Sequence, residues 1–238
     1  MEIEIAVSKI DRFGSASGGE SLEAVERPNG GVSVVLSKGM QQQKNNKQIS
    51  NLVVRNVIKL IAEGVRDGAA ARAAADALFT DKHGEASASL NILSADIQTC
   101  TIVLTCNNPT PMFIIRNGKI DAFTNESSLI GSAGDIRPFI SEIPLEADLF
   151  IILFTSGFLT AGKDNGRALD IPLSLSSMIE DSHPTSQQMS DALLSQALKI
   201  DQNQPSDDMC VVVMHVLGDQ RDGIRRMSVS MPFPLQQE

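Results

Sequence analysis

A short β-branched run that leads through a glycine turn into an amphipathic helix most constrains the fold of this chain. Residues Val32 to Leu36 follow the turn signal Pro28-Asn29-Gly30-Gly31, which predicts a buried strand. The strand is expected to end at Ser37-Lys38-Gly39-Met40. From Gln48 to about Glu63, apolar residues recur at helical spacing. Such a turn holds side chains in one geometry at a sheet edge, where chemistry is often located.

The size and charge of the chain exclude several classes of protein. Its 238 residues suffice for one large domain with a single core. The formal net charge of −9 argues against general nucleic-acid binding, which needs a basic surface. No apolar run reaches the ~20 residues that span a bilayer, so no membrane partner is expected. Because Met1-Glu2-Ile3-Glu4 lacks the basic start of a secretory signal, a cytoplasmic location is expected.

The three cysteines, Cys100, Cys106 and Cys210, form no Cys-x-x-Cys pair. Each lies in or beside a β-rich run. An odd number of cysteines with apolar neighbours predicts buried free thiols in a reducing compartment. The histidines His83, His183 and His215 are too widely spaced for a metal-ligand pair, so we expect His215, within a strand, to be structural.

The remaining elements follow from periodicity and turn signals. Three further helices are expected at Gly68–Phe79, Pro172–Glu180 and Ser186–Lys199, with Asp67 and Ser186 as N-caps. Asn117-Gly118 predicts a type I′ hairpin, because that turn needs positive φ at both positions. Alternation or continuous apolar character predicts strands at Glu2–Ser8, Glu20–Glu26, Ala88–Leu93, Thr101–Cys106, Met112–Arg116, Lys119–Phe123, Arg137–Ile143, Leu149–Phe154, Met209–Val216 and Ile224–Met231.

This order predicts an α+β fold with four layers. Hairpins require antiparallel pairing, and two helix pairs separated by strands favour two stacked sheets with helices outside. We therefore expect an α–β–β–α sandwich. No linker-like shift in composition interrupts the chain, so residues 1–231 are expected to form one domain, with residues 232–238 as a C-terminal tail.

Four separated strand ends resemble the motifs of a known family. They are Ser17-Gly18-Gly19-Glu20, Ser37-Lys38-Gly39-Met40, Thr155-Ser156-Gly157 and Asp207-Asp208-Met209. Together they resemble the metal-dependent PPM-type (protein phosphatase 2C-like) serine/threonine phosphatases, in the bacterial SpoIIE-like branch. The resemblance covers roughly Ile5 to Val216 and implies the same α–β–β–α sandwich.

The resemblance also implies what the site would contain. In the family, aspartates at these strand ends hold two Mg²⁺ or Mn²⁺ ions that activate water and orient a phosphoester. Carried onto this chain, the aspartate positions are occupied by Gly19, Lys38, Ser156 and Asp207, so only the last keeps its acid. Glu20, Gly39 and Asp208 lie next to these positions.

Lys38 is the informative substitution, because it places a cation where the resemblance implies a metal. Its ammonium would repel a divalent ion and is expected to point toward Asp207 or Asp208. An ordinary solvated lysine in a turn is the alternative, and the two aspartates could simply begin a strand. Glu20 could replace the missing first ligand, although a shift of one residue turns a strand side chain to the other face.

Three functions remain open. The first is a pseudophosphatase that has lost the dimetal site, needs no cofactor and binds a phosphorylated or phosphorylatable regulatory protein, as the resemblance implies. The second is an active Mg²⁺- or Mn²⁺-dependent phosphatase with a reduced site at Asp207, Asp208 and Glu20, and with Asp11 as a further candidate. The third is a small-molecule-binding or scaffold domain. Lys38, Lys44 and Lys47 could form a patch for a phosphorylated partner or serve only solubility.

Overall fold

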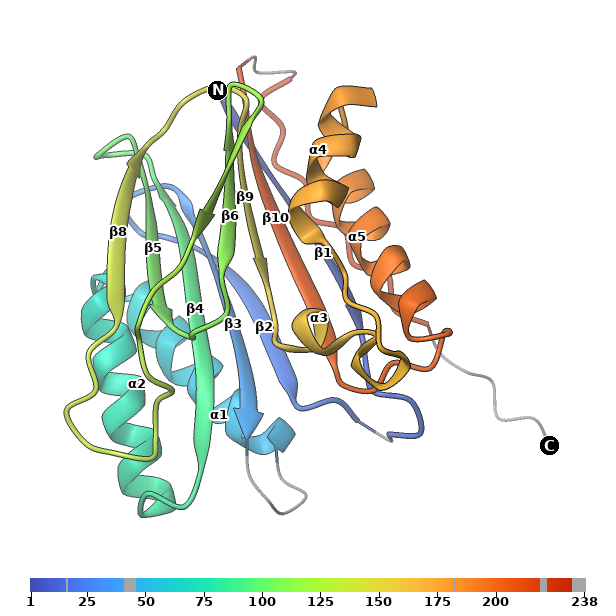
Figure 1. Cartoon of the computed structure of the whole chain (residues 1–238). Coiled ribbons are helices and arrows are strands. Elements are labelled where there is room, and N and C mark those ends of the chain that lie inside the picture. The colour runs from blue at the N-terminus through green and yellow to red at the C-terminus, as the bar shows by residue number, and fades with distance from the viewer. Residues whose placement is uncertain (16, 41–45, 182, 219–221, 233–238) are drawn as a thin grey trace.

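The chain folds into two antiparallel sheets stacked face to face, with helices on both outer faces (Figure 1). The structure is a computed structural model and describes residues 1–15, 17–40, 46–181, 183–218 and 222–232. This arrangement confirms the predicted α–β–β–α sandwich. Among the described residues, no helix has the length and apolar character needed to cross a bilayer.

Each sheet has five strands, and the sequence order of the strands is interleaved between the two. The first sheet, sheet A, has the order β1-β10-β9-β6-β7. Its strands are β1 (Glu2–Ile10), β6 (Met112–Arg116), β7 (Lys119–Phe123), β9 (Leu149–Phe154) and β10 (Met209–Leu217). The second sheet, sheet B, has the order β2-β3-β4-β5-β8. Its strands are β2 (Glu20–Glu26), β3 (Val32–Met40), β4 (Ser87–Asp96), β5 (Thr101–Asn107) and β8 (Phe139–Pro144).

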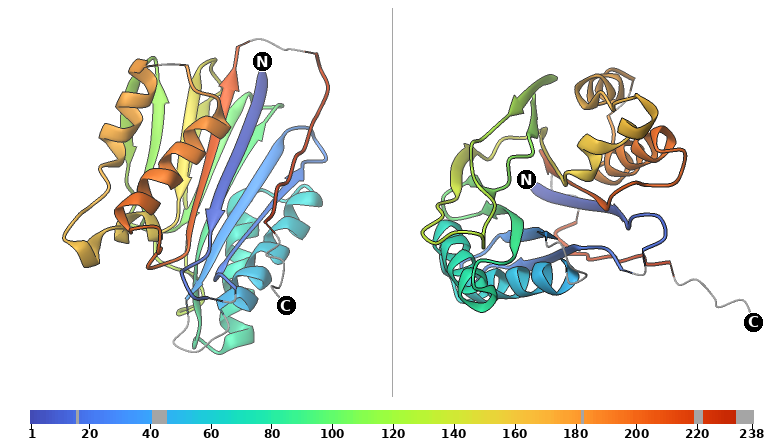
Figure 2. Two further views of the ribbon diagram at one scale, coloured as in Figure 1. Left: turned by 90° about the vertical axis from the view of Figure 1, so that its right-hand side faces the viewer. Right: turned by 60° about the horizontal axis from the view of Figure 1, so that its bottom comes forward.

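One pair of helices covers each sheet, as the two views in Figure 2 show. Helices α1 (Asn46–Ala62) and α2 (Asp67–Lys82) pack on sheet B. Helix α5 (Ser186–Ile200) packs on β1 and β10 of sheet A, with α4 (Ile171–Asp181) beside it. A short helix, α3 (Gly157–Thr160), and a 3₁₀ turn at Lys163–Asn165 follow β9. Neither of these two short elements was expected from the sequence.

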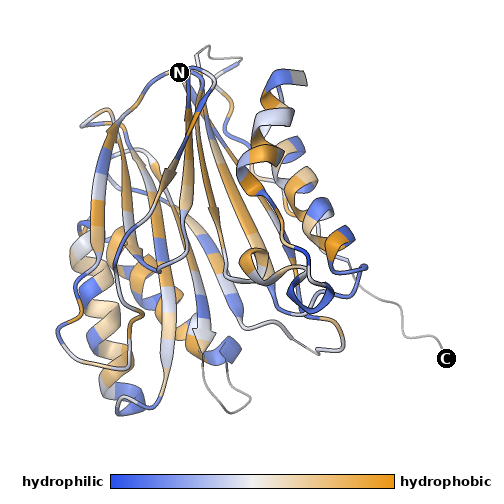
Figure 3. Ribbon diagram, in the orientation of Figure 1, coloured by the Kyte–Doolittle hydropathy of each residue, from blue (hydrophilic) through white to orange (hydrophobic). Residues whose placement is uncertain are grey.

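Three apolar layers hold the sandwich together. The central layer lies between the sheets and includes Leu36, Leu104, Ile151 and Val212. A second layer joins sheet B to α1 and α2, and a third joins sheet A to α3, α4 and α5. Figure 3 shows the hydrophobic residues concentrated along the strands and on the helix faces turned toward them. Burying apolar surface on both faces of a sheet explains why the central strands are continuous apolar runs rather than alternating ones.

Several element boundaries differ from the sequence prediction. The predicted turn Ser37–Met40 is part of β3 and not a break that ends it, because β4 pairs with β3 along this whole length. Asp67 is the first residue of α2 rather than its cap, and its carboxylate accepts a hydrogen bond from Arg27. The N-cap of α5 is Thr185 rather than Ser186, with a reciprocal capping box to Gln188.

Two further predictions are wrong. Cys100 is exposed in the turn between β4 and β5, at φ 52°, because that turn takes it out of the sheet, whereas Cys106 and Cys210 are buried free thiols. Ile224–Met231 is extended but forms no strand, since no neighbouring strand pairs with it in the structure. The Asn117-Gly118 turn is confirmed, with φ values of 52° and 72°.

Candidate functional site

Four strand ends meet at one end of the sandwich, because antiparallel neighbours place the start of one strand beside the end of the next. In sheet B, Glu20 at the start of β2 lies directly opposite Lys38 near the end of β3. In sheet A, Ser156 follows the end of β9, and Asp207 precedes the start of β10. The fold therefore brings together the four positions that the motifs singled out.

The ammonium of Lys38 lies at the centre of this group and is held from several sides. Lys38 Nζ donates to Asp207 Oδ2 at 2.6 Å, to Ser156 Oγ at 3.3 Å and to the carbonyl oxygen of Asp208 at 3.4 Å. Its side chain is 8% exposed. Lys38 is thus a buried, paired cation and not a solvated turn residue, and it points toward Asp207 as the sequence predicted.

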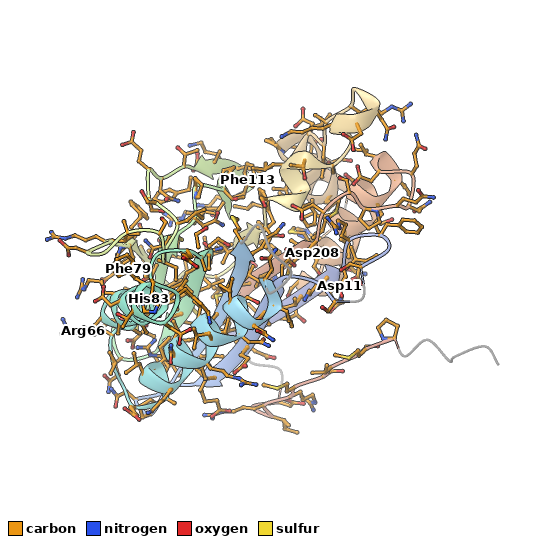
Figure 4. All side chains as sticks on the ribbon, turned by 90° about the horizontal axis from the view of Figure 1, so that it is seen from below. Asp11, Arg66, Phe79, His83, Phe113 and Asp208 are labelled. Carbon is orange, nitrogen blue, oxygen red and sulfur yellow. The ribbon has the colours of Figure 1, made fainter. Side chains whose placement is uncertain are left out.

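Asp208 faces the loop that precedes β2 rather than Lys38. Its Oδ1 accepts from the backbone N–H of Arg12 at 2.8 Å, and its Oδ2 accepts from that of Gly19 at 2.6 Å. Figure 4, which views the molecule from this end, shows Asp208 beside Asp11, a residue of the loop that precedes β2. The carboxylate therefore holds the loop against β10 through both of its oxygens.

Glu20 is completely buried beside Lys38, with a carboxylate oxygen 4.0 Å from the ammonium. Its side chain therefore faces the site, contrary to the expectation that a shift of one residue would turn it away. Burial is the main cause that raises the pKa of Glu20 to about 7, against the opposing effects of the Thr155 hydroxyl, Lys38 and Lys9. The buried environment therefore favours the protonated form of this carboxyl group.

Glycines allow helix α1 to begin directly against the strand ends. A Cβ at Gly39 would lie 2.1 Å from the carbonyl oxygen of Asn46, and a Cβ at Gly19 would lie 2.9 Å from the Cβ of Asn46. Real Cβ atoms essentially never come this close to a heavy atom of another residue, so an aspartate at position 19 would require the start of α1 to move. The space for a side chain at this position is already occupied by the start of the helix.

Two lysines converge behind the site on one carbonyl group. Lys9 Nζ donates to the carbonyl oxygen of Glu20 at 2.9 Å, and Lys47 Nζ donates to the same oxygen. Partial burial and the nearby charge of Lys9 lower the pKa of Lys47. Lys47 therefore makes a structural contact within the chain. Lys44, which was predicted to form a patch with Lys38 and Lys47, lies outside the described residues.

An open cleft of about 760 Å³ borders the site. Lys38, Ser156 and Asp207 line it together with Gly84–Ser87 and Ser132. Of the histidines, His215 is stacked on Phe150 at the other end of β10 and takes no part in the site.

Comparison with known proteins identifies the family. The sequence model described as Stage II sporulation protein E (SpoIIE) matches residues 30–217. This chain belongs to the SpoIIE family. A search among curated protein sequences found no match.

Solved structures with the same fold are phosphatase domains. One is the protein phosphatase 2C domain of SpoIIE from Bacillus subtilis with a fragment of its regulatory domain, at a TM-score of 0.75 and 18% identity over 91% of this chain. The SpoIIE-family chain spans 64% of that longer structure. Another is the catalytic domain of PstP in complex with two manganese ions, at a TM-score of 0.71 and 15% identity over 90% of this chain and 98% of that one. At these identities the likeness establishes the fold.

The side chains of this SpoIIE-family chain do not fit a pair of divalent ions. Asp207 is paired with the ammonium of Lys38, and each oxygen of Asp208 accepts a hydrogen bond from a backbone N–H group. Within the described residues, no three His, Cys, Asp or Glu side chains gather where they could hold a metal ion. A hard divalent ion needs several oxygen ligands, and a lysine in their midst repels it.

The buried carboxyl group of Glu20 makes stability depend on pH. Because its folded pKa of about 7 lies above the ordinary value of 4.5 for a glutamate, the folded state resists ionisation, and stability is lost as pH rises from about 4.5 to 7. We expect Glu20→Gln to remove this loss and to be about 3 kcal/mol more stable than the native chain at pH 8, but not at pH 4.5. Urea unfolding across this pH range measures the difference. Glu23→Gln, at an exposed position of the same strand, is the control, and an equal response of both variants would refute the assignment.

Proposed function

We propose that this SpoIIE-family chain is a pseudophosphatase, which keeps the phosphatase fold without dimetal hydrolysis and acts by binding a regulatory protein. The proposal rests on one observation. The Lys38 ammonium, 2.6 Å from Asp207, supplies the positive charge at the strand ends that the family's chemistry draws from metal ions.

The surrounding residues support this proposal. Ser156 has no carboxylate, and the start of α1 at Asn46 occupies the space that a side chain at Gly19 would need. Three of the four motif positions therefore lack an acid. The alternative of an active phosphatase with a reduced site would require Asp207 to leave Lys38, and the buried Glu20 to leave its position 4.0 Å from the same ammonium.

The cleft beside the site is the surface that we propose for the partner. Its lining is mostly polar and small, with Ser87, Ser132 and the exposed Glu85 around the Lys38–Asp207 ion pair. An extended peptide segment carrying a serine or phosphoserine fits such an open, polar groove better than a compact apolar ligand does. The partner is accordingly a protein that is phosphorylated or can be phosphorylated.

Two measurements on the full chain test the proposal. Hydrolysis of a phosphoserine peptide should be indistinguishable from the buffer blank with and without millimolar Mn²⁺. A partner captured from lysate by the native chain should be lost from Glu85→Lys, in the cleft, but kept by Glu63→Lys, at an exposed position beyond the far end of α1. Manganese-dependent turnover, or equal capture by both variants, would contradict the proposal.

A further inference from the structure

The C-terminal segment Ile224–Pro232 has the pattern of a strand but no strand partner. Met227, Val229 and Met231 alternate with Arg226, Ser228 and Ser230, a period that places all three apolar side chains on one face. Met227 and Val229 are each 80% exposed, and Met231 is 64% exposed. Figure 4 shows the side chains of this segment standing apart from the body of the molecule. An apolar strand face left in water is a candidate for pairing with a sheet edge.

A free sheet edge lies beside this segment. β2 is the terminal strand of sheet B, and its outer side has no strand neighbour among the described residues. Arg225 donates to Glu26, at the end of β2, at 2.7 Å. The pKa of Arg226 is raised, chiefly by its hydrogen bond with Asp222 and in addition by Glu2 of β1. The start of the segment is thus held near the ends of β1 and β2 at once.

The gap between these two edge strands exposes part of the central core. Ile3, Ile5 and Val7 of β1 and Leu22 of β2 pack against the inter-sheet layer but are only partly buried. β1 and β2 are terminal strands of their sheets on the same side of the sandwich, and in the part of the chain that the structure describes no third strand covers these side chains from outside. An added strand with an apolar inner face would complete the layer.

The direction and register of the segment suit this position. Glu2, Glu26 and Leu217 lie at the end of the sandwich opposite the site, so a chain that continues from Arg225 along β2 runs antiparallel to it. With Arg225 opposite Glu26, Met227 faces Ala24 and Val229 faces Leu22. This register turns Met227 and Val229 toward Leu22 and the inter-sheet core, and it places Met231 on the same face, opposite Glu20. Figure 2 shows the segment passing beside the β2 edge in this direction.

We propose that residues Ile224–Pro232 dock on the free edge of β2 as a sixth strand of sheet B, in the same chain. The backbone supplies the ladder of hydrogen bonds, as in other cases of strand addition. The apolar face covers the gap between β1 and β2. Arg225 and Arg226, opposite the acidic ends of these strands, set the register.

Disulfide trapping in the full chain tests the proposed register. Cys100 is first replaced by serine, since it is the exposed cysteine of the three. Under mild oxidation, Leu22→Cys with Val229→Cys should form an intramolecular disulfide. Leu22→Cys with Ser228→Cys should form it at least tenfold more slowly, because neighbouring strand residues point to opposite faces.

Amide hydrogen exchange gives a second readout without substitutions. The amides of residues 227–231 should exchange at least tenfold more slowly than free peptide amides, and truncation after Leu217 should speed exchange in β2. An intermolecular disulfide would assign the edge to a second copy and overturn the proposal. Unprotected amides at 227–231, or equal trapping of both cysteine pairs, would overturn it as well.

Discussion

Replacing Lys38 with aspartate is expected to lower the free energy of unfolding by about 4 kcal/mol, because it adds an anion to a buried site that already holds Glu20 and Asp207. For a domain of this size the melting temperature should fall by about 10 °C. The loss should be larger at pH 8 than at pH 5, since the raised pKa of Glu20, about 7, means that its carboxyl group ionises between these two pH values. Calorimetric melting at both pH values measures it.

The control for this variant is Lys38→Met, which keeps the length and packing of the side chain and removes only its charge. It should lower the free energy of unfolding by about 2 kcal/mol, because Asp207 is 36% exposed and water partly replaces the lost ammonium of Lys38. Millimolar Mn²⁺ should raise the melting temperature of Lys38→Asp by several degrees and leave those of Lys38→Met and the native chain unchanged. A Lys38→Asp variant as stable as the native chain would show that the ammonium is not held in the site.

Replacing Arg27 with methionine is expected to destabilise the fold by about 4 kcal/mol, although this residue lies far from the site. Its guanidinium donates to Asp67 at 2.5 Å and to Ser33 at 2.9 Å, and the two ionic side chains are 11% and 4% exposed. Removing one member of a buried ion pair leaves the other charge without compensation. The contact ties the start of α2 to sheet B, so its loss should loosen the helical layer over that sheet. Urea unfolding measures the cost.

Lys119→Met is the control for this prediction. It removes a cation that also pairs with one carboxylate, that of Asp121, but the two side chains of that pair are 76% and 55% exposed. Exposed pairs contribute at most about 1 kcal/mol. Equal losses in the two variants would mean that burial of the Arg27–Asp67 pair does not matter.

The sequence predicted the architecture because its strongest local signals agree with the tertiary structure. The continuous apolar run Leu149–Phe154 is a central strand, and the Asn117-Gly118 turn has the two positive φ values that a type I′ hairpin needs. Both depend on local chemistry or on full burial, which periodicity and turn residues report directly.

The failures occur where a distant partner decides the structure. β3 extends to Met40 because β4 pairs with it, and Asp67 is recruited by Arg27 instead of capping its own helix. The strand pattern at Ile224–Met231 is real, but a strand also needs a neighbour, which no local pattern specifies. The burial of Glu20 beside Lys38 likewise follows from the pairing of β2 with β3.

The candidate site, too, was predicted from the sequence only in part. The motifs identified Gly19, Lys38, Ser156 and Asp207, and the structure brings these positions to one end of the sandwich. The part played by Asn46, which closes the space beside Gly19, is not visible in the sequence, because it depends on how closely α1 approaches the strand ends.

Titration of the full chain with Mn²⁺ by calorimetry, alongside phosphoserine-peptide hydrolysis before and after a chelator, tests the central claim most directly. The ion pair of Lys38 with Asp207 predicts no saturable binding heat and no turnover above the blank in either condition. Saturable binding of two ions, with hydrolysis that the chelator abolishes, would contradict it.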